Sequence, residues 1–358
     1  MPSGDASPVT IDVHTHYVPR GWPDLARAVG AAEVAGPAEG AGAAEDWPWL
    51  RLESEHEATI MIRSREFRRI QANSWDAELR LADMDADGVD VQVVSPTPVF
   101  FSYSRPAAQG LKIARIFNDL ALEICAPAPD RFWPLCQVPL QDPDLACAEL
   151  DRCLAAGHLG VEIGNHVGDR DLDDAGIVTF LRHCAQVGAP VLVHPWDMPG
   201  SPRLNRWMAQ WLTGMPAETH LSILALVLGG VFDQVPDSLR ICFAHGGGSF
   251  PFWVGRMDNA WHRRPDLIAT SEHPPSHYLS RFSVDSVVFA DPALRLLVDT
   301  LGPDRVMLGS DYPYPLGERP VGSLVRGAPF LTDSERARLL GGNAARFLGR
   351  AVASVGGA

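Results

Sequence analysis

The sequence predicts an α/β fold, a (β/α)8 TIM barrel in which eight parallel strands alternate with helices. Eight short apolar runs are typical of buried parallel strands, and helical stretches separate them. The runs are residues 9–13, 90–95, 132–138, 159–163, 190–194, 240–244, 282–286 and 305–309. An open doubly wound sheet is the alternative, but no glycine-rich fingerprint for dinucleotide phosphates follows the first run. We therefore expect residues 1–358 to form one barrel domain.

The first strand leads directly into His14-Thr15-His16. Side chains alternate between the two faces of a strand, so these two histidines share a face and can bind one metal ion together. An insertion too long for one barrel unit follows, over about residues 21–70. Within it, residues 50–67 alternate enough to form a small hairpin, and residues 30–46 have the composition of a loop. Because insertions after barrel strands lie on the catalytic face, we expect this one to cover the site.

The later units repeat the pattern of an apolar strand followed by a helix. Over residues 142–156, for example, Leu145, Leu150 and Leu154 fall near one helical face, and Gly157 ends the helix.

Polar residues stand where three of the later strands end: His194, His245 and Asp311. The carboxyl ends of parallel barrel strands meet at one rim, so these residues should converge with His14 and His16. Imidazole and carboxylate groups suit Zn²⁺, and Mn²⁺ or Fe²⁺ could take the same place. A single histidine at a strand end is usually structural, but five ligand-type residues at the correct ends favour a metal site.

Composition excludes several classes of partner. The formal net charge of −14 argues against a nucleic-acid or anionic-membrane surface, because such partners need a basic face. No apolar stretch is long enough to cross a bilayer and no secretory leader is visible, so we expect a cytoplasmic protein. The six cysteines lack C-x-x-C spacing and are expected to be reduced core thiols. A small anionic substrate would need particular arginines to bind it.

The strand-end residues resemble those of the amidohydrolase superfamily, in which a His-x-His pair, later histidines and a final aspartate recur. Over almost the whole chain, the sequence is similar to the 2-amino-3-carboxymuconate-6-semialdehyde decarboxylase family of tryptophan and kynurenine degradation. The stretches that carry this similarity are residues 84–93, 137–142, 155–160, 194–198, 245–250 and 307–313.

The resemblance implies a role for each site residue. His14, His16, His194 and Asp311 would bind one Zn²⁺ per subunit, and His245 would act as acid and base beside a metal-bound water. Arg68 and Arg256 match the arginines that bind substrate carboxylates, although Arg69 is an equally near neighbour on the insertion. The family uses the second arginine across a subunit interface, so a homodimer is implied.

Other residues bear on the site without settling it. Trp196, Trp207 and Phe289 could line a flat pocket, although most aromatic residues belong to the core. Binuclear amidohydrolases use a carboxylated lysine at the end of strand 4, but the one lysine, Lys112, lies on a predicted helix. One ion is therefore favoured, although Glu162 could in principle bridge a second. Residues 246–248, three glycines, could either hold an anion or form a tight turn.

We therefore expect a metal-dependent, non-oxidative decarboxylase. Its substrate would be 2-amino-3-carboxymuconate-6-semialdehyde or a closely related aromatic-derived carboxylate. The alternatives are a hydrolase or dehydrative cyclase acting on a 3-hydroxyanthranilate-derived compound, a binuclear hydrolase, and a non-catalytic metal-binding scaffold. Glu162, where the family is expected to have glutamine, and the altered insertion leave the exact substrate open.

Overall fold

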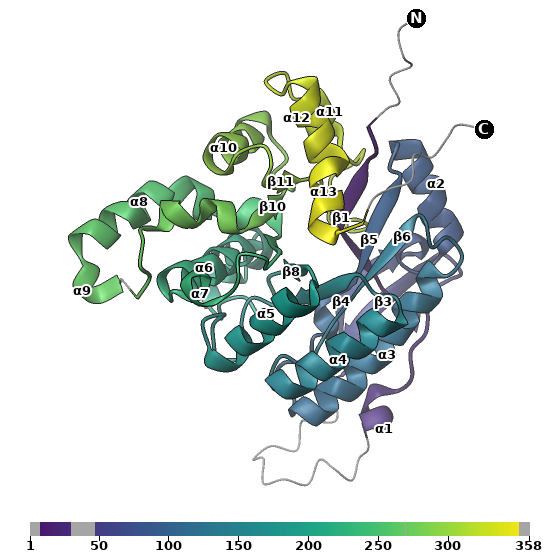
Figure 1. Ribbon diagram of the computed structural model, residues 1–358. Coiled ribbons are helices and arrows are strands. Elements are labelled where there is room, and N and C mark those ends of the chain that lie inside the picture. Colours follow the sequence, from purple (N-terminus) through teal and green to yellow (C-terminus); the bar gives the residue numbers. More distant parts are fainter. Residues whose placement is uncertain (1–7, 30–46, 269, 351–358) are drawn as a thin grey trace, which may run out of the picture.

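A computed structural model describes residues 8–29, 47–268 and 270–350. Eight strands form one sheet in the order β1-β5-β6-β7-β8-β9-β10-β11, and every adjacent pair is parallel (Figure 1). They are β1 (Ile11–Tyr17), β5 (Val91–Pro96), β6 (Phe132–Cys136), β7 (Gly160–Ile163), β8 (Val191–Val193), β9 (Ile241–Phe243), β10 (Ser283–Asp285) and β11 (Val306–Met307). The N–H of Val13 donates to Leu308 O and that of His16 donates to Tyr312 O, at 2.9 and 2.7 Å, so the last strand returns to the first. The predicted barrel is confirmed.

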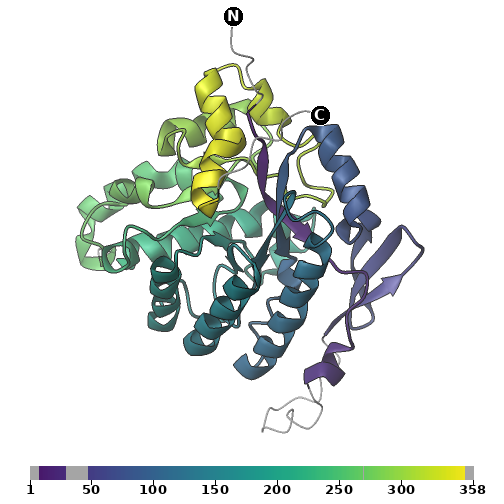
Figure 2. The ribbon, with the colours of Figure 1, turned by 45° about the vertical axis from the view of Figure 1, so that its right-hand side comes forward.

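Helices surround the strands, as Figures 1 and 2 show from two directions. The longer ones are α2 (Ala77–Asp87), α3 (Ala107–Cys125), α4 (Pro143–Ala156), α5 (Ala175–Val187), α6 (Met215–Leu228), α8 (Phe250–Arg263) and α10 (Asp291–Leu301). Shorter ones are α1 (Leu25–Val29), α7 (Val231–Gln234), α9 (Pro265–Ile268), α11 (Ser323–Gly327), α12 (Asp333–Ala337) and α13 (Asn343–Leu348). Helix α4 begins where the sequence predicts, because the Asp142 carboxylate accepts from two backbone N–H groups, and it ends at Gly157 with φ 114°. No described helix is long and apolar enough to cross a membrane.

The apolar side chains divide into two layers because strand residues alternate between faces. One cluster, which includes Val93, Leu135 and Met307, combines alternate residues of several strands and fills the barrel interior. The neighbouring residues, such as Val94 and Cys136, pack outward in a larger cluster with the helices. The six cysteines are free thiols, and five of them are buried.

The insertion forms a separate antiparallel sheet with the strand order β2-β3-β4. The strands are β2 (Pro48–Leu52), β3 (Glu57–Ile62) and β4 (Arg65–Gln71), so the structure adds a third strand to the expected hairpin. Only Ile70 of β4 is buried, which explains why its sequence lacks a clear strand pattern. Ile60 and Ile70 pack with Phe100 and Phe117, attaching this sheet to the barrel. The expected loop at 30–46 lies outside the described residues.

Candidate metal centre

Four side chains converge at the carboxyl end of the barrel. His14 and His16 lie on β1, His194 follows β8 and Asp311 follows β11, and one ligand atom from each lies within 4.8 Å of the others. The His14 and His16 Nε2 atoms are 3.1 Å apart. The Asp311 Oδ1 atom is 3.3 Å from the Nε2 of His16 and 3.6 Å from that of His14. The structure therefore brings together all four residues that the sequence suggests as metal ligands.

The donor set fits a divalent ion. Ligands about 2.1 Å from a tetrahedral metal lie about 3.4 Å from each other. The three separations among His14, His16 and Asp311 are close to this value. The Nε2 atom of His194 is buried and has no hydrogen-bond partner among the described residues. Burial lowers the pKa of His16 to about 4 and that of His194 well below its usual value, so both imidazoles are neutral, as metal ligands must be.

A buried carboxylate, Asp285, holds the centre from behind. Its Oδ2 atom is 2.6 Å from Nδ1 of His14, which orients the other ring nitrogen of His14 toward the ligand cluster. Although burial alone would lower the pKa of His14, Asp285 raises it to about 9, so a metal ion that binds here must displace a proton from this ring. Asp285 also accepts from the N–H groups of His245 and Gly246. Asp285 is not among the residues predicted from the sequence, although its place near the end of the apolar run 282–286 is a usable signal.

A glycine makes the approach of Asp285 to His14 feasible. A Cβ atom at Gly309 would lie 2.8 Å from the Asp285 Cβ and 2.9 Å from the His14 Cβ. Any larger residue at position 309 would therefore push the two partners apart.

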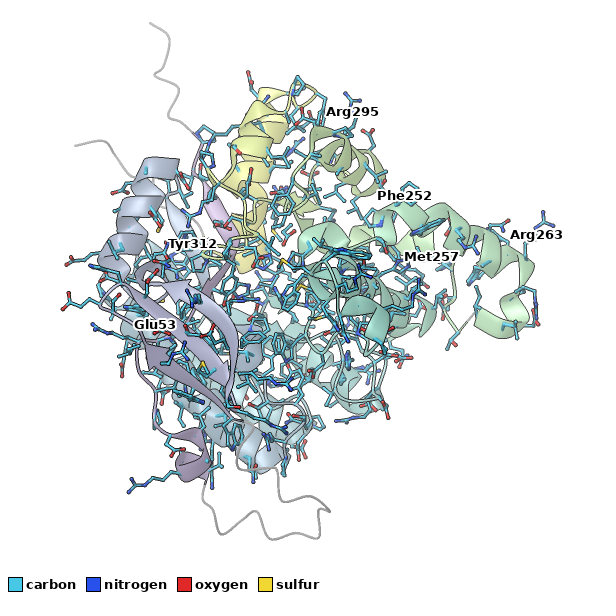
Figure 3. All side chains as sticks on the ribbon, turned by 180° about the vertical axis from the view of Figure 1, so that it is seen from behind. Glu53, Phe252, Met257, Arg263, Arg295 and Tyr312 are labelled. Carbon is cyan, nitrogen blue, oxygen red and sulfur yellow. The ribbon has the colours of Figure 1, made fainter. Side chains whose placement is uncertain are left out.

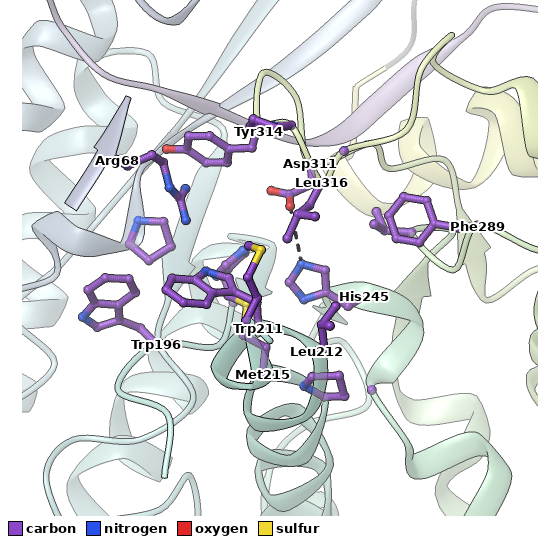
Figure 4. Close-up of a pocket in the computed structure, with 18 of the residues that line it drawn as sticks. Arg68, Trp196, Trp211, Leu212, Met215, His245, Phe289, Asp311, Tyr314 and Leu316 are labelled. Carbon is purple, nitrogen blue, oxygen red and sulfur yellow. Dashed lines mark ion pairs between the residues drawn. The ribbon is translucent and has the colours of Figure 1, made fainter. Parts of the chain in front are cut away.

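His245 lies beside the four ligands without belonging to them. Its Nε2 atom is 3.9 Å from Asp311 Oδ2, the ion pair that Figure 4 marks with a dashed line. Its ring centroid lies 5.1 Å from the ring centroids of both His14 and His194. His245 and Asp311 both have left-handed backbone, with φ 55° and 62°, a conformation that costs non-glycine residues about 1–3 kcal/mol. Hydrogen bonds from His245 N to Asp285 and from Asp311 N to His14 O hold these two backbones in place.

The three glycines after His245 form a tight turn. Their N–H groups donate to Asp285, to Ala244 O and to His245 O, so they are not free to bind an anion.

A cavity of about 1050 Å³ opens above the centre, with His194, His245 and Asp311 in its wall. In Figure 4, Arg68 and Trp196 lie on one side of His245 and Phe289 lies on the other. Leu212, Met215 and Leu316 make much of the remaining wall apolar.

Arg68 is the better placed of the two adjacent arginines. Its Cζ atom lies 4.0 Å from the ring centroid of Tyr314, whose hydroxyl is 2.6 Å from Thr97 Oγ1. No carboxylate among the described residues forms an ion pair with Arg68. Arg69 also touches the cavity, but its side chain is 77 % exposed and lies 3.9 Å from Glu66. The contact between Arg68 and the Tyr314 ring was not predicted, because only the fold brings the loop after β11 close to β4.

The structure separates the three expected pocket aromatics. Trp196 lines the cavity edge-on to Phe67, at 5.9 Å between ring centroids, and Phe289 lines the opposite side. Trp207 is 75 % exposed and is not among the lining residues of the described chain; its indole packs on the Arg206 guanidinium instead. Trp211, which is not among the predicted pocket residues, also lines the cavity.

Arg256 lies on α8, away from the cavity lining of its own chain. It is exposed, and its Cζ atom is 5.8 Å from the Trp253 ring. On the same helix Phe252 is 67 % exposed while Met257 is buried (Figure 3).

The two residues considered as ligands of a second metal ion, Lys112 and Glu162, are not part of the four-residue cluster. Lys112 is on α3 and donates to Val29 O. Glu162 is fully buried on β7, and its Oε1 atom is 3.9 Å from His16 Nδ1, on the side of the ring opposite the ligand nitrogen. Within the described chain, the four-residue cluster is the one group that could hold a metal ion.

Comparisons with known proteins agree with this geometry. Residues 11–350 match the family model described as amidohydrolase. The chain is 39% identical over 341 residues to a 2-amino-3-carboxymuconate-6-semialdehyde decarboxylase of Dictyostelium discoideum, covering 95% of this chain and 91% of that protein. It is 32% identical to the protein of the same name from Caenorhabditis elegans, covering 94% of each.

Solved structures share the fold. The crystal structure of 5-carboxyvanillate decarboxylase from Sphingomonas paucimobilis has a TM-score of 0.77 and 26% identity, covering 96% of this chain and 100% of that one. The enzyme of the same name from Novosphingobium aromaticivorans, solved with manganese and a nitrobenzoic acid, has a TM-score of 0.74 and 23% identity, covering 97% of both chains.

Proposed function

The chain belongs to the amidohydrolase family, in the group of the 2-amino-3-carboxymuconate-6-semialdehyde decarboxylases, and we propose its substrate and the roles of its residues on this basis. The protein is a metal-dependent decarboxylase of the amidohydrolase superfamily. We propose that it acts on 2-amino-3-carboxymuconate-6-semialdehyde, or on a closely related aromatic-derived carboxylate, in the degradation of tryptophan.

The observation that carries this proposal is the position of the metal centre in the wall of a largely apolar cavity beside one arginine. Arg68 is held on the Tyr314 ring, with no carboxylate of the described residues to neutralise it. A guanidinium binds a carboxylate through two parallel hydrogen bonds, so Arg68 is suited to hold an anionic substrate in this acidic protein. Trp196 and Phe289 offer faces for a conjugated carbon skeleton.

His14, His16, His194 and Asp311 would hold the metal ion. When bound, a divalent ion supplies a Lewis acid and lowers the pKa of water at the site. We propose zinc, one ion per subunit; manganese is the alternative, because a relative of the same fold was solved with it.

The chain's own groups would carry the proton transfer. His245 Nε2 would deliver a proton to the substrate carbon that bears the leaving carboxylate. The bond from that carbon to the carboxylate breaks, carbon dioxide leaves, and the electron pair returns to the conjugated system. The carbon thus exchanges its carboxylate for hydrogen, while Arg68 keeps the substrate oriented and the apolar walls limit access of water.

Two further parts of the proposal concern the whole assembly. We propose a cytoplasmic homodimer in which Arg256 of each subunit completes the cavity of the other. The support is the exposed position of Arg256 beside the exposed apolar side chain of Phe252.

A direct assay tests the substrate. Freshly prepared 2-amino-3-carboxymuconate-6-semialdehyde is added to the metal-loaded protein, and loss of its absorbance is followed together with release of carbon dioxide. Both should occur with similar rates. Parallel assays use 2,6-dihydroxybenzoate and a 3-hydroxyanthranilate ester. Carbon dioxide released from the dihydroxybenzoate alone, or cyclisation of the ester alone, would overturn the substrate assignment.

A further inference from the structure

A layer of buried polar side chains lies directly behind His16 in the barrel interior. Ser95, Gln137 and Glu162 are at most 1% exposed. The Ser95 hydroxyl, both side-chain amide atoms of Gln137, both carboxyl oxygens of Glu162 and His16 Nδ1 lack a hydrogen-bond partner among the described residues. Most buried polar atoms in proteins are paired, so a group of unpaired ones in a single layer calls for an explanation.

The strand register shows that these side chains are neighbours. His16 on β1 is paired with Ser95 on β5, so their side chains point the same way. Glu162 is paired with Leu192, which belongs to the cluster that fills the barrel interior. Gln137 follows Cys136, the partner of Val161, and therefore lies beside Glu162 on the adjacent strand.

The three ligand imidazoles differ in how their outer nitrogen is held. Nδ1 of His14 lies 2.6 Å from Asp285, and Nδ1 of His194 lies 3.0 Å from Pro195 O. A neutral imidazole that offers Nε2 to a metal carries its proton on Nδ1, and this N–H needs an acceptor when buried. For His16 the nearby acceptor is Glu162, whose Oε1 atom lies 3.9 Å away.

We propose that Glu162 is a positioning residue that holds His16 through its Nδ1 atom and thereby strengthens metal binding. A shift of about 1 Å brings the two atoms into hydrogen-bond range. Glu162 then does for His16 what Asp285 does for His14, and the neighbouring Gln137 amide can hold the second carboxyl oxygen. The inference rests on the proposed metal centre but not on the substrate, and it places Glu162 behind the ligands rather than between two ions.

The experiment measures metal affinity without substrate. Metal-free wild type, E162Q and E162L are titrated with Zn²⁺ and with Mn²⁺ against a competing chelator, and the visible spectrum of each Co²⁺-loaded form is recorded. Loss of a partner behind a metal-binding histidine typically weakens binding by about 10–100-fold, which we expect for E162L together with a changed cobalt spectrum. E162Q keeps an acceptor oxygen and should lose less than about tenfold.

Two further variants serve as controls. D285L removes the corresponding acceptor behind His14 and should weaken metal binding as E162L does. E149Q alters another fully buried carboxylate, on α4 and hydrogen-bonded to Asn118, and should leave metal affinity unchanged. If E162L does not fold, E162D replaces it, because the shorter side chain cannot reach His16 and should also weaken binding at least tenfold.

Three results would overturn the inference. The first is an E162L or E162D protein with wild-type affinity and an unchanged cobalt spectrum. The second is a wild type that binds two ions where E162Q binds one, which would make Glu162 a bridging ligand. The third is a wild type that binds no ion, which would also end the proposed metal centre. Absence of turnover with a tightly bound ion would instead contradict only the substrate assignment.

Discussion

His245 and Asp311 are close neighbours with different surroundings, and their substitution should have different consequences. Asp311 contributes an oxygen to the four-residue cluster, whereas His245 is not part of it and its Nε2 atom lies 3.9 Å from Asp311 Oδ2. D311A should therefore lose the metal ion and turnover together. H245A should keep its ion and lose about 10²–10⁴-fold in kcat, because only proton transfer is removed.

Metal content per chain, measured beside turnover, separates these cases. The matched control is H183A, which removes a histidine on α5 that lies 2.7 Å from Asp151. It should change neither quantity. An H245A protein that purifies without metal would instead make His245 a ligand.

Arg68 and Arg69 offer a second contrast at the scale of single residues. R68K replaces a planar guanidinium, which can make two parallel hydrogen bonds to a carboxylate, with a compact ammonium group. It should therefore raise KM by about 10–100-fold while changing kcat much less. R69A should change KM by less than about threefold, because its side chain is mostly solvated beside Glu66. Steady-state kinetics on the two variants provide the measurement. The opposite ranking would assign the substrate carboxylate to Arg69.

The positions of the site residues on secondary-structure elements explain which of them can be predicted from the sequence. The ligands were predictable because each stands at the end of an apolar strand run, and parallel strands end at one rim. Asp285 obeys the same rule and could have been found. Tyr314 could not, since its contact with Arg68 joins a loop after β11 to a strand of the insertion. Trp207 lies in a turn after β8, whereas Trp211 lies in the π-helical segment Gln210–Gly214 that precedes α6, and no periodicity in the sequence predicts this difference.

The insertion shows a similar limit on how much of the fold can be predicted from the sequence. The barrel strands carry continuous apolar runs because both of their faces are covered, so all eight were predicted. Strand β4 has one face toward solvent and consists largely of charged residues, with Ile70 alone buried. Its pairing with β3 depends on tertiary packing, and the strand that carries Arg68 was therefore the one that the pattern did not indicate.

The hydrogen bonds between α3 and α4 lead to a prediction about stability. Glu149 is fully buried on α4 and accepts from Arg152, Asn118 and Arg115. Burial alone would raise the pKa of Glu149, but these hydrogen bonds hold it below its ordinary value of 4.5. The carboxylate thus stabilises the fold above pH 4.5, and this contribution is lost as the pH falls through the lowered pKa.

E149Q should lower the free energy of unfolding by about 1–3 kcal/mol at pH 7. The difference between wild type and variant should stay constant down to about pH 5 and shrink below it. Urea unfolding across this pH range measures both quantities. A difference that grows toward low pH would contradict the assigned sign.

At the scale of the whole molecule, the apolar surface of α8 and the position of Arg256 belong together. Phe252, Trp253 and Arg256 are exposed on a helix at the edge of the barrel, and Arg256 does not line the cavity of its own chain. Exposed apolar side chains that cluster on one helix are typical of a protein interface. A twofold dimer would place each Arg256 where only the other subunit can use it.

Mixed dimers test this arrangement. H245A and R256A carry different affinity tags, are expressed together, and are purified over both tags so that only the mixed dimer remains. Each parent alone should be inactive or nearly so. The mixed dimer has one cavity with an intact His245 and an Arg256 from its partner, so it should recover about half of the wild-type activity. If Arg256 served its own chain, both cavities of the mixed dimer would be defective, and no activity would return.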